Sequence, residues 1–518
     1  MISSQGVVMN DDKFAYDEVP YSSFTFPQTR PDRLATLGAF HGLKTASPDK
    51  CRVLELGCGD GTNLISFAYI LPDSEFVGID LSETHIVKAE QTAKELGLSN
   101  LTFLKEDVMD FSRDRFGEFD FIIAHGLFSW VPDFVQEKVL DIYAECLTEE
   151  GVGYISYNAY PGCHIRQMIW HMMQFHTEKI EDPMAKVNHG VNFLNFLVAA
   201  SPTDSLYQTM IKTELSQFAE RTAENIFHDD FASLNQPFYF HEFVDKLNVN
   251  GLQFLSEVDS FWMEAGQISP EISEKLDELG DDIVRREQYI DFIKCRPFRS
   301  TLICRDTKKI DRHPAPGILK NFYLASQVLP ESPKPNLEDT SKVTFLGPEG
   351  GKLEVDHPLT KAALVCLEKA WSSCRTLDGM IDEAKLLCGG ATDADVEKTT
   401  EHLLEMFHSG FVYLHRFRPR FASKPGEFPT ASAFVRWQLH HKSDNLTTLS
   451  GMNLKPDSDL MRLMLMLLDG SRDRNALVSE VAARTEFDEA KKDELMAQLP
   501  VTIENKLLEF AKLGLLLA

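Results

Sequence analysis

Three glycines at alternate positions, directly after an apolar segment, are the strongest chemical signal in the sequence. Gly57, Gly59 and Gly61 follow the segment Arg52–Leu56 and precede an amphipathic segment over 63–71. Glycine lacks a Cβ, so a turn built from it lets the backbone approach a ligand that side chains would exclude. The alternate spacing differs from the G-x-G-x-x-G of dinucleotide sites. The turn therefore predicts a cofactor site and leaves the kind of nucleoside cofactor open.

Acidic residues end the next two apolar segments. Asp80 lies 23 residues after Gly57, and Asp107 is followed by the aliphatic Val108. A carboxylate at the end of a second strand can accept hydrogen bonds from both hydroxyls of a ribose. An acid followed by an aliphatic residue suits an adenine, which needs one hydrogen bond and one apolar wall. The spacing predicts a nucleoside-binding edge.

The elements that must position these residues alternate regularly between residues 52 and 158. Short, nearly continuous apolar segments are typical of strands buried on both faces of a sheet. Strands are expected at Arg52–Leu56, Glu75–Asp80, Leu101–Lys105, Phe119–Ala124 and 151–157, with helices at 63–71, 83–96 and 134–147. This alternation predicts an α/β fold with a parallel, doubly wound sheet, which binds ligands at the carboxyl ends of its strands.

These residues and the order of the elements resemble class I S-adenosylmethionine-dependent methyltransferases, which have a Rossmann-like sheet. The resemblance covers 55–61, Asp80 and 107–108. It implies S-adenosyl-L-methionine as cofactor, with the glycines beside its methionine part, Asp80 on the ribose and Asp107 on the adenine. Glu55, beneath the loop, is implied to help hold the methionine amino group. The cofactor-binding residues predicted in this way are Glu55, Gly57, Gly59, Gly61, Asp80, Leu81, Asp107, Val108 and His125.

Nucleic acid is disfavoured as a substrate by motif and by charge. Residues 124–130 lack the Asn/Asp-Pro-Pro-aromatic motif of enzymes that methylate the amino groups of bases, and the Pro-Cys nucleophile of cytosine enzymes is missing. The chain holds 52 basic and 79 acidic residues, a net charge of −27. Binding to nucleic acid by bulk charge needs clustered Lys and Arg, so no nucleic-acid partner is expected.

The rim of the expected site is aromatic and neutral-polar. Aromatic walls with hydroxyl tips can hold an alkyl amine, desolvate its stem and orient its lone pair. The rim comprises Phe26, His125 and Tyr157 together with the predicted substrate-binding residues Tyr16, Tyr21, Phe128, Trp130, Asn158 and Tyr160. His125 and Tyr157 are the candidate catalytic residues for removing a proton from the amine; a capping role in the loop is the alternative for His125.

A closer resemblance spans about residues 13–305. Residues 16–21, 157–164 and 287–292 look like methyltransferases that carry a methyltransferase regulatory domain. The best-described members are rickettsial protein-lysine methyltransferases that modify outer-membrane proteins. The resemblance implies a multi-domain, homodimeric enzyme that transfers methyl groups to lysine ε-amines of a protein.

Two other functions stay open. One is methylation of a small molecule such as a sugar or metabolite, and the other is a non-catalytic regulatory protein that binds S-adenosylmethionine. The intact Gly57, Gly59, Gly61 and Asp80 argue against a degenerate scaffold. The large accessory segments favour a macromolecular substrate.

The remaining sequence predicts several accessory segments. Proline-rich breaks at 330–335 and 419–429 separate mostly helical regions with weak winged-helix character. We predict residues 1–160 as the first part of the methyltransferase core, 161–236 as a helical insertion (lid or dimerisation), 237–310 as completion of the sheet with a second insertion near 260–297, 311–340 as a linker, 341–420 as a winged-helix-like module, and 421–518 as a second helical or winged-helix-like module. If the last two recruit protein, removing 341–518 should reduce transfer to protein and spare cofactor binding.

Composition bounds the remaining possibilities. Residues 1–160 hold 12 basic and 26 acidic residues, a net charge of −14, which suits solubility or attraction of a cationic substrate. The nine cysteines show no C-x-x-C pair, and the histidines lack metal-ligand spacing, so no metal is predicted. No signal peptide or membrane-spanning run is visible, so a cytoplasmic protein without membrane insertion is expected.

Overall fold

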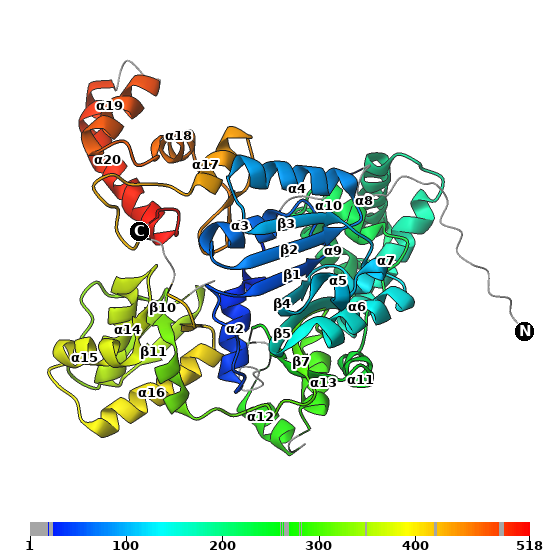
Figure 1. Cartoon of the computed structure of the whole chain (residues 1–518), viewed down its shortest axis with the longest axis horizontal. Helices are drawn as coiled ribbons and strands as arrows, with labels where there is room; N and C mark the ends of the chain where they lie inside the picture. Colours follow the sequence, from blue (N-terminus) through cyan, green and yellow to red (C-terminus); the bar gives the residue numbers. More distant parts are fainter. Residues whose placement is uncertain are drawn as a thin grey trace, which may run out of the picture.

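A seven-stranded mixed sheet lies at the centre of the computed structural model (Figure 1). The structure describes residues 19, 24–259, 261, 263, 269–278, 280, 282–347, 350–418, 422–485 and 492–517. The strand order is β3-β2-β1-β4-β5-β7-β6. The strands are β1 (Arg52–Leu56), β2 (Glu75–Asp80), β3 (Leu101–Lys105), β4 (Phe119–Ala124), β5 (Leu147–Asn158), β6 (Leu252–Glu257) and β7 (Phe298–Arg305).

The first five strands are parallel, and β7 runs antiparallel between β5 and β6. Successive residues of β1 enter different cores: Val53 packs with the helices on one face, and Leu54 with those on the other. Side chains of a strand alternate between the two faces, so a strand covered on both sides must be apolar throughout. The predicted Rossmann-like, doubly wound fold is confirmed.

Five helices cover the two faces of this sheet. They are α2 (Pro31–Phe40), α3 (Thr62–Ile70), α4 (Glu83–Glu95), α6 (Asp133–Cys146) and α11 (Phe240–Val249). The one-turn helix α5 (Arg113–Phe116) lies between β3 and β4 in the chain and has no buried residue. The hydroxyl of Ser82 caps α4 by accepting a hydrogen bond from His85 N. The short 3₁₀ turns η1 (Pro27–Thr29), η2 (Val108–Asp110) and η3 (Phe128–Trp130) lie beside them. Turns η2 and η3 follow β3 and β4 at the ligand-binding edge.

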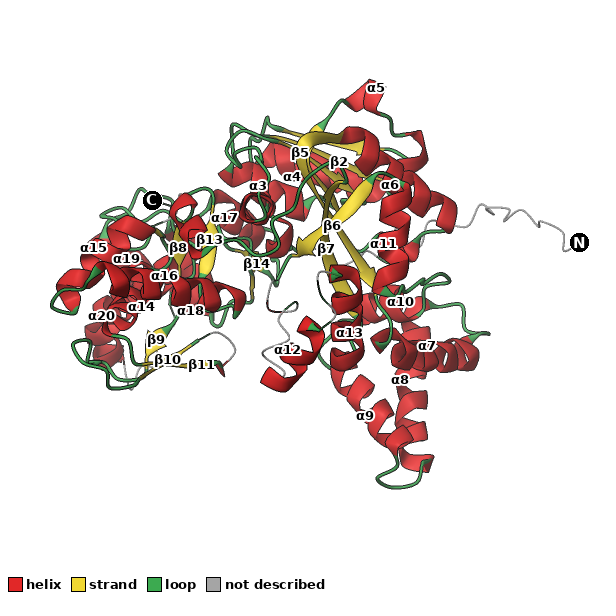
Figure 2. Ribbon diagram, turned by 90° about the horizontal axis from the view of Figure 1, so that it is seen from below, coloured by secondary structure: helices red, strands yellow, loops and turns green. Residues whose placement is uncertain are grey.

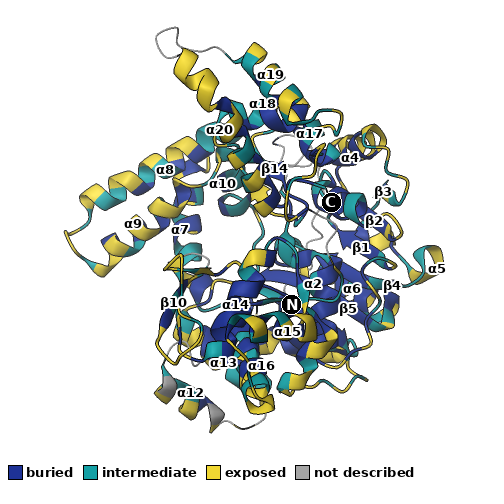
Figure 3. Cartoon of the chain, turned by 90° about the vertical axis from the view of Figure 1, so that its left-hand side faces the viewer, coloured by how far each residue is buried: buried dark blue, intermediate teal, exposed yellow. Residues whose placement is uncertain are grey.

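Two helical insertions interrupt the second half of the sheet. The first, between β5 and α11, consists of α7 (Gly162–Thr177), α8 (Pro183–Ala200), α9 (Leu206–Phe218) and α10 (Ala223–Asp230). Helices α8 and α9 project from the body of the molecule and are exposed along much of their length (Figure 3). The second insertion, α12 (Pro270–Asp277) and α13 (Ile283–Lys294), separates β6 from β7.

The C-terminal third forms two further modules on the other side of the sheet from the first insertion (Figure 2). The first contains η5 (Pro316–Asn321), β8 (Tyr323–Ala325), β9 (Leu329–Pro330), β10 (Val343–Leu346), β11 (Lys352–Val355), α14 (Pro358–Ala370), β12 (Arg375–Thr376), α15 (Leu377–Leu387), α16 (Asp393–His408) and β13 (Tyr413–His415). The second contains α17 (Ala433–His440), β14 (Leu446–Thr447), β15 (Asn453–Leu454), α18 (Asp459–Leu467), α19 (Arg474–Arg484) and α20 (Lys492–Lys512).

The last module ends in a short apolar tail, in which Leu516 forms a β-bridge with Ala431. The hairpin of this module is β14–β15, which follows α17. Within the described residues, no helix combines the length and apolar character that a bilayer crossing requires.

Candidate active site

The glycine loop follows β1 and is hydrogen-bonded to β2, because Gly57 N and Cys58 N both donate to Ile79 O. Gly57, Gly59 and Gly61 all have positive φ, at +71°, +55° and +73°. A Cβ on Gly61 would lie 2.3 Å from the ring of Phe103, whereas a Cβ on Gly59 would meet no atom within 4 Å. Gly61 is therefore required by packing. Gly59 borders open space, as a backbone segment that approaches a ligand must.

Asp80 ends β2 and holds this loop by its carboxylate. Oδ2 accepts a hydrogen bond from Gly59 N at 2.8 Å, and Oδ1 accepts one from Ser82 N at 2.9 Å. A carboxylate oxygen can accept more than one hydrogen bond. Asp80 is thus oriented by backbone donors while it keeps acceptor capacity toward the edge of the sheet.

Glu55 lies beneath the loop, with only 3% of its surface exposed. Asn63, in the first turn of α3, donates from Nδ2 to Glu55 Oε1 at 2.8 Å. Oε2 is buried and has no hydrogen-bond partner. Burial, with the charges of Asp80 and Asp60 nearby, raises the pKa of Glu55 to about 8. A buried carboxylate oxygen without a partner is a place where a cationic group of a ligand would be stabilised.

The expected adenine wall lies at the ends of β2 and β3. Asp107 Oδ1 accepts a hydrogen bond from Met109 N at 2.9 Å and so begins η2, while Val108 is buried. Two apolar side chains stay exposed here, Leu81 at 46% and Met109 at 41%. Sequence reasoning included Leu81 and missed Met109, which the turn after Asp107 exposes.

His125 follows β4 in an aromatic and hydroxyl-lined environment. Its Nδ1 lies 3.0 Å from Tyr154 Oη and 3.2 Å from Ser156 Oγ. The ring of Phe26 lies on the imidazole, with 3.8 Å between ring centroids. Burial lowers the pKa of His125 to about 4, so the imidazole is neutral at neutral pH.

Tyr157 lies on the opposite face of β5 from Tyr154 and Ser156. It is 1% exposed and stacks on Phe243 at 4.1 Å between centroids, and burial raises the pKa of its phenol. This placement favours a packing role and argues against Tyr157 as a proton acceptor. Tyr154, two residues before Ser156, replaces it beside His125. Sequence reasoning missed Tyr154, although its alternation with Tyr157 along a strand was a usable signal.

The predicted substrate-binding residues separate into four groups, of which the last, Tyr160, is described below. Phe128 and Asn158 are buried, since Phe128 packs against Phe238 and Asn158 donates from Nδ2 to Asn235 Oδ1 at 2.9 Å. Both side chains are held by these contacts within the protein, which favours a structural role for them. Trp130 is half-buried in η3. Tyr16 and Tyr21 lie outside the described residues.

Tyr160 belongs to a surface group that we call the aromatic surface: Tyr160, His164, Tyr239, Tyr289 and Phe292. Tyr160 stacks on His164 at 4.0 Å and lies 5.1 Å from Tyr239, between ring centroids. Phe292 lies 6.1 Å from Tyr239 and 6.2 Å from Tyr289. Tyr289 and Phe292 are exposed. The aromatic residues of the segment 287–292 therefore point outward.

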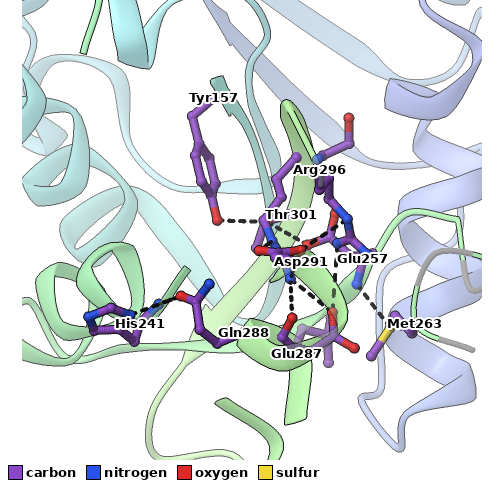
Figure 4. A network of polar contacts seen from close by, with 12 residues as sticks. Tyr157, His241, Glu257, Met263, Glu287, Gln288, Asp291, Arg296 and Thr301 are labelled. Atoms are coloured by element: carbon purple, nitrogen blue, oxygen red, sulfur yellow. Dashed lines mark hydrogen bonds and ion pairs between the residues drawn. The ribbon is translucent and has the colours of Figure 1, made fainter. Parts of the chain in front are cut away.

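The acidic residues of the same segment point inward, into a buried ion network (Figure 4). Arg299 donates to Glu257 Oε1 at 2.6 Å, Asp291 Oδ2 at 2.9 Å and Glu287 Oε2 at 3.0 Å. Arg296 Nε lies 3.1 Å from Asp291 Oδ1. Two guanidinium groups thus face three carboxylates, and burial raises the pKa of Glu287. The network ties α13 to β6 and β7.

This network reaches the environment of His125 through β7. Glu257 Oε2 accepts a hydrogen bond from Ser300 N at 3.1 Å, and Ser300 Oγ accepts one from Tyr154 Oη at 3.0 Å. Tyr154 in turn lies beside His125. The buried charges therefore help orient the polar groups of the site from below, without touching a ligand.

The residues present fit S-adenosylmethionine. The loop at Gly59 is open, Glu55 Oε2 is a buried acceptor without a partner, Asp80 is an oriented carboxylate, and Leu81 and Met109 are exposed apolar walls. These groups match an ammonium, a ribose and an adenine in turn. Among the described residues, no cluster of three His, Cys, Asp or Glu side chains could hold a metal ion.

Comparisons with known proteins agree with this geometry. Residues 47–218 match a methyltransferase domain, 222–305 the "Predicted methyltransferase regulatory domain", and 427–514 the "PKMT, C-terminal winged helix domain". An uncharacterized protein of Rickettsia prowazekii is 30% identical over 503 residues, covering 94% of this chain and 89% of the relative. The solved structure of PKMT2 from Rickettsia typhi in complex with AdoHcy superposes with a TM-score of 0.88 at 26% identity, covering 96% of this chain and all of that one.

The fold and the site define a class I S-adenosylmethionine-dependent methyltransferase. Within this class, the chain belongs to the family of methyltransferases with a methyltransferase regulatory domain, together with its rickettsial relative. S-adenosyl-L-methionine is its cofactor.

Proposed function

We propose that this methyltransferase transfers methyl groups to lysine side-chain amines of a protein substrate. The observation that carries the proposal is the full-length similarity to PKMT2, which extends through the insertions and both C-terminal modules. A small-molecule methyltransferase has no evident need for so much additional surface. The net charge of −14 over residues 1–160 also favours a cationic, lysine-bearing substrate.

We assign the cofactor contacts from the polar groups at the edge of the sheet. Asp80 holds the ribose, Asp107 and Val108 hold the adenine, and Leu81 and Met109 cover its faces. Glu55 Oε2 holds the methionine ammonium, and the backbone around Gly59 lies along the methionine part. Each assignment pairs a group of the cofactor with an oriented or exposed group of matching chemistry.

The chemistry needs alignment more than acid–base catalysis. S-adenosylmethionine, when bound, supplies an electrophilic methyl group, and the attacking amine must be neutral and in line with it. A lysine amine has an unperturbed pKa of about 10.4, which desolvation among aromatic rings lowers. With its pKa near 4, His125 is a weak base. We therefore assign it to orienting the amine, together with Tyr154 and Phe26.

The aromatic surface is the proposed docking face for the polypeptide around the target lysine. Tyr160 follows β5 directly, so this surface begins at the ligand-binding edge of the sheet. Phe298, exposed on β7, lies 6.3 Å from His125 between ring centroids and adds an aromatic wall beside the site. Aromatic side chains combine a large contact area with attraction for cations, which suits a lysine stem and its amine.

We also propose that the enzyme works as a homodimer through the projecting helices. Phe175, Phe196 and Leu206, on α7, α8 and α9, are strongly exposed. Large exposed apolar side chains on one projection are typical of a protein interface. Light scattering tests this directly: Phe196→Asp should give monomers, and a monomeric unsubstituted protein would contradict the proposal.

Methyl transfer from radiolabelled S-adenosylmethionine tests the proposed activity. The enzyme is incubated with lysate protein, and the labelled protein is separated on a gel and hydrolysed to amino acids. The expected label is methyl-lysine, and it should be reduced with the Asp80→Ala variant at a limiting concentration of S-adenosylmethionine. Label in small molecules alone would support the sugar or metabolite alternative. No transfer by a protein that binds AdoHcy would support a regulatory role.

A further inference from the structure

Two segments from opposite ends of the chain meet beside the glycine loop. The first is residues 24–30, which we call the strap. The second is residues 448–453, the turn of the β14–β15 hairpin, which we call the wing turn. The module that carries the wing turn lies against α3 and α4 (Figure 1), where Trp437 Nε1 donates to Glu95 Oε2 at 2.6 Å.

Asn453 of the wing turn binds the backbone of the strap in both directions. Its Oδ1 accepts a hydrogen bond from Thr25 N at 3.1 Å, and its Nδ2 donates to Thr25 O at 2.7 Å. Thr25 Oγ1 donates to Gly451 O at 2.8 Å, and Thr25 is almost completely buried. The side-chain amide therefore pairs with Thr25 as a neighbouring strand would, and it fixes the position of this residue on both sides.

The next residue of the strap contacts the catalytic domain. Phe26 N donates to Asn63 Oδ1 at 2.9 Å, and the Phe26 ring lies on His125. Asn63 Nδ2 donates to Glu55 Oε1 at 2.8 Å and to Thr29 Oγ1 at 3.0 Å. Thr25 is thus held by the wing turn, while Phe26 is bonded to the residue that positions Glu55.

The bond from Phe26 decides which way the Asn63 amide points. A backbone N–H needs an acceptor, so it takes the oxygen of Asn63 and turns the amide nitrogen toward Glu55. Without this bond, Asn63 Oδ1 loses the contact that holds it, and only the two hydrogen bonds from Nδ2 fix the amide. The donor to Glu55 Oε1 would then be held less firmly, and so would the carboxylate proposed to hold the cofactor ammonium.

We infer that Asn453 is a positioning residue for the cofactor site, acting through Thr25 and Phe26 on Asn63 and Glu55. The winged-helix module is thereby part of the structure that sets cofactor affinity. A chain without residues 341–518 loses Asn453, so truncation should weaken cofactor binding, contrary to the expectation from the sequence. The simpler alternative is that Asn453 only docks the module onto the core.

Calorimetric titration of the full-length protein with AdoHcy distinguishes a positioning role of Asn453 from a role in docking the module alone. Asn453→Ala should weaken binding about tenfold, which corresponds to about 1.4 kcal/mol. Trp437→Phe is the matched control, since it removes another side-chain hydrogen bond between the same module and the core, away from the strap. It should leave the affinity unchanged. Unchanged affinity of Asn453→Ala, or equal weakening in both variants, would overturn the inference.

Two further measurements test whether Asn453 acts on Glu55 through the strap and Asn63. In an Asn63→Ala background, Asn453→Ala should cost little more, because coupled residues are not additive; a full additional tenfold loss would contradict the path. The Asn63 hydrogen bond lowers the pKa of Glu55, against the opposing charges of Asp80 and Asp60. The pH at which AdoHcy affinity levels off should therefore rise in Asn453→Ala and stay unchanged in Trp437→Phe.

A second variant covers the case in which Asn453→Ala does not fold. Thr25→Val keeps the shape of the side chain and removes the hydrogen bonds of Oγ1 to Gly451 O and to Asn453 Oδ1, while the backbone bonds between Thr25 and Asn453 stay possible. It should weaken AdoHcy binding several-fold, with a melting temperature within a few degrees of the unsubstituted protein. Unchanged affinity in a folded Thr25→Val protein would count against the strap as the connection.

Discussion

Asn63 donates a hydrogen bond to Glu55 Oε1 over 2.8 Å and leaves the second oxygen of this buried carboxylate without a partner. The two residues lie on either side of the glycine loop, Glu55 in β1 and Asn63 in the first turn of α3. This pair explains why a carboxylate can stay buried in a domain that already has an acidic edge. The protein supplies a hydrogen-bond donor to Oε1, and we propose that the ammonium of the cofactor is the partner of Oε2.

The affinity for AdoHcy should rise between pH 6 and pH 8 and level off above. The pKa of Glu55 is raised to about 8, so below this pH the free enzyme carries a protonated carboxyl. A cationic ammonium favours the carboxylate, so binding releases a proton and is favoured as pH rises through this window. Calorimetry in buffers of different ionisation enthalpy measures the released proton.

Glu55→Gln should remove both the released proton and the pH dependence. The same residue affects the stability of the free protein with a definite sign. Because its folded pKa is above the unfolded value of about 4.3, it contributes stability at low pH that is lost as pH rises toward 8. Thermal unfolding of the unsubstituted protein should show this loss and Glu55→Gln should not. A pH-independent affinity in the unsubstituted protein would exclude Glu55 as the ammonium partner.

Asp80→Ala should weaken AdoHcy binding by at least about tenfold, the loss expected for about 1.4 kcal/mol. The substitution removes the proposed ribose contact and the acceptor for Gly59 N and Ser82 N. Asp110→Ala is the control because it makes the same change of charge at an exposed position of η2. Equal affinities of the two variants, measured by calorimetry, would contradict the assignment.

Gly61→Ala should mainly lower stability, whereas Gly59→Ala should mainly lower cofactor affinity. Gly61→Ala places a methyl group against Phe103 and should destabilise the fold by about 1–3 kcal/mol beyond the cost of positive φ. Gly59→Ala meets open space, so it should cost only about 1–2 kcal/mol for its left-handed conformation and lower cofactor affinity more strongly. Thermal unfolding and calorimetry on both variants give the comparison. A folded Gly59→Ala protein with full affinity would mean that the cofactor does not approach this residue.

Arg299→Met should destabilise the methyltransferase domain by about 3–5 kcal/mol, because three buried carboxylates lose their main partner. Arg285→Met, on the exposed side of α13, is the matched control and should change stability little. Chemical unfolding followed by circular dichroism measures both. Similar denaturation midpoints of the Arg299→Met and Arg285→Met variants would show that the network adds nothing to stability.

His125→Ala should lower kcat/KM for methyl transfer about tenfold, the effect of about 1.4 kcal/mol of lost alignment, without moving the acid limb of the pH–rate profile. The pKa of His125 is about 4, so this group does not titrate between pH 6 and pH 9. With S-adenosylmethionine at saturation, so that cofactor binding through Glu55 does not contribute, the acid limb belongs to the substrate amine. Rates of labelled methyl transfer across this range test the point. A limb near pH 6.5 that disappears in His125→Ala would identify His125 as a general base after all.

Sequence reasoning could predict the glycine loop and its carboxylate because their signals are local. The spacing of Gly57, Gly59 and Gly61 and the position of Asp80 depend on neighbouring residues and on one strand–helix–strand unit. The same reasoning placed Phe128 and Asn158 at the substrate, but both are buried. Position at the end of a strand does not reveal which side chains stay exposed, because exposure depends on what packs above them. Phe238 and Asn235, from the segment between α10 and α11, cover these two residues.

The alternation of apolar and amphipathic segments was sufficient for the α/β class and the doubly wound sheet, since these follow from backbone periodicity and from residues close in sequence. The place of β7 between β5 and β6 is decided by the fold. Only the folded chain revealed the pairs that complete the site. Phe26 and Asn63 are 37 residues apart, Tyr154 and Ser300 are 146 apart, and Thr25 and Asn453 are 428 apart. Hydrogen bonds and burial depend on distance in space, and a single sequence carries no measure of that distance between remote segments.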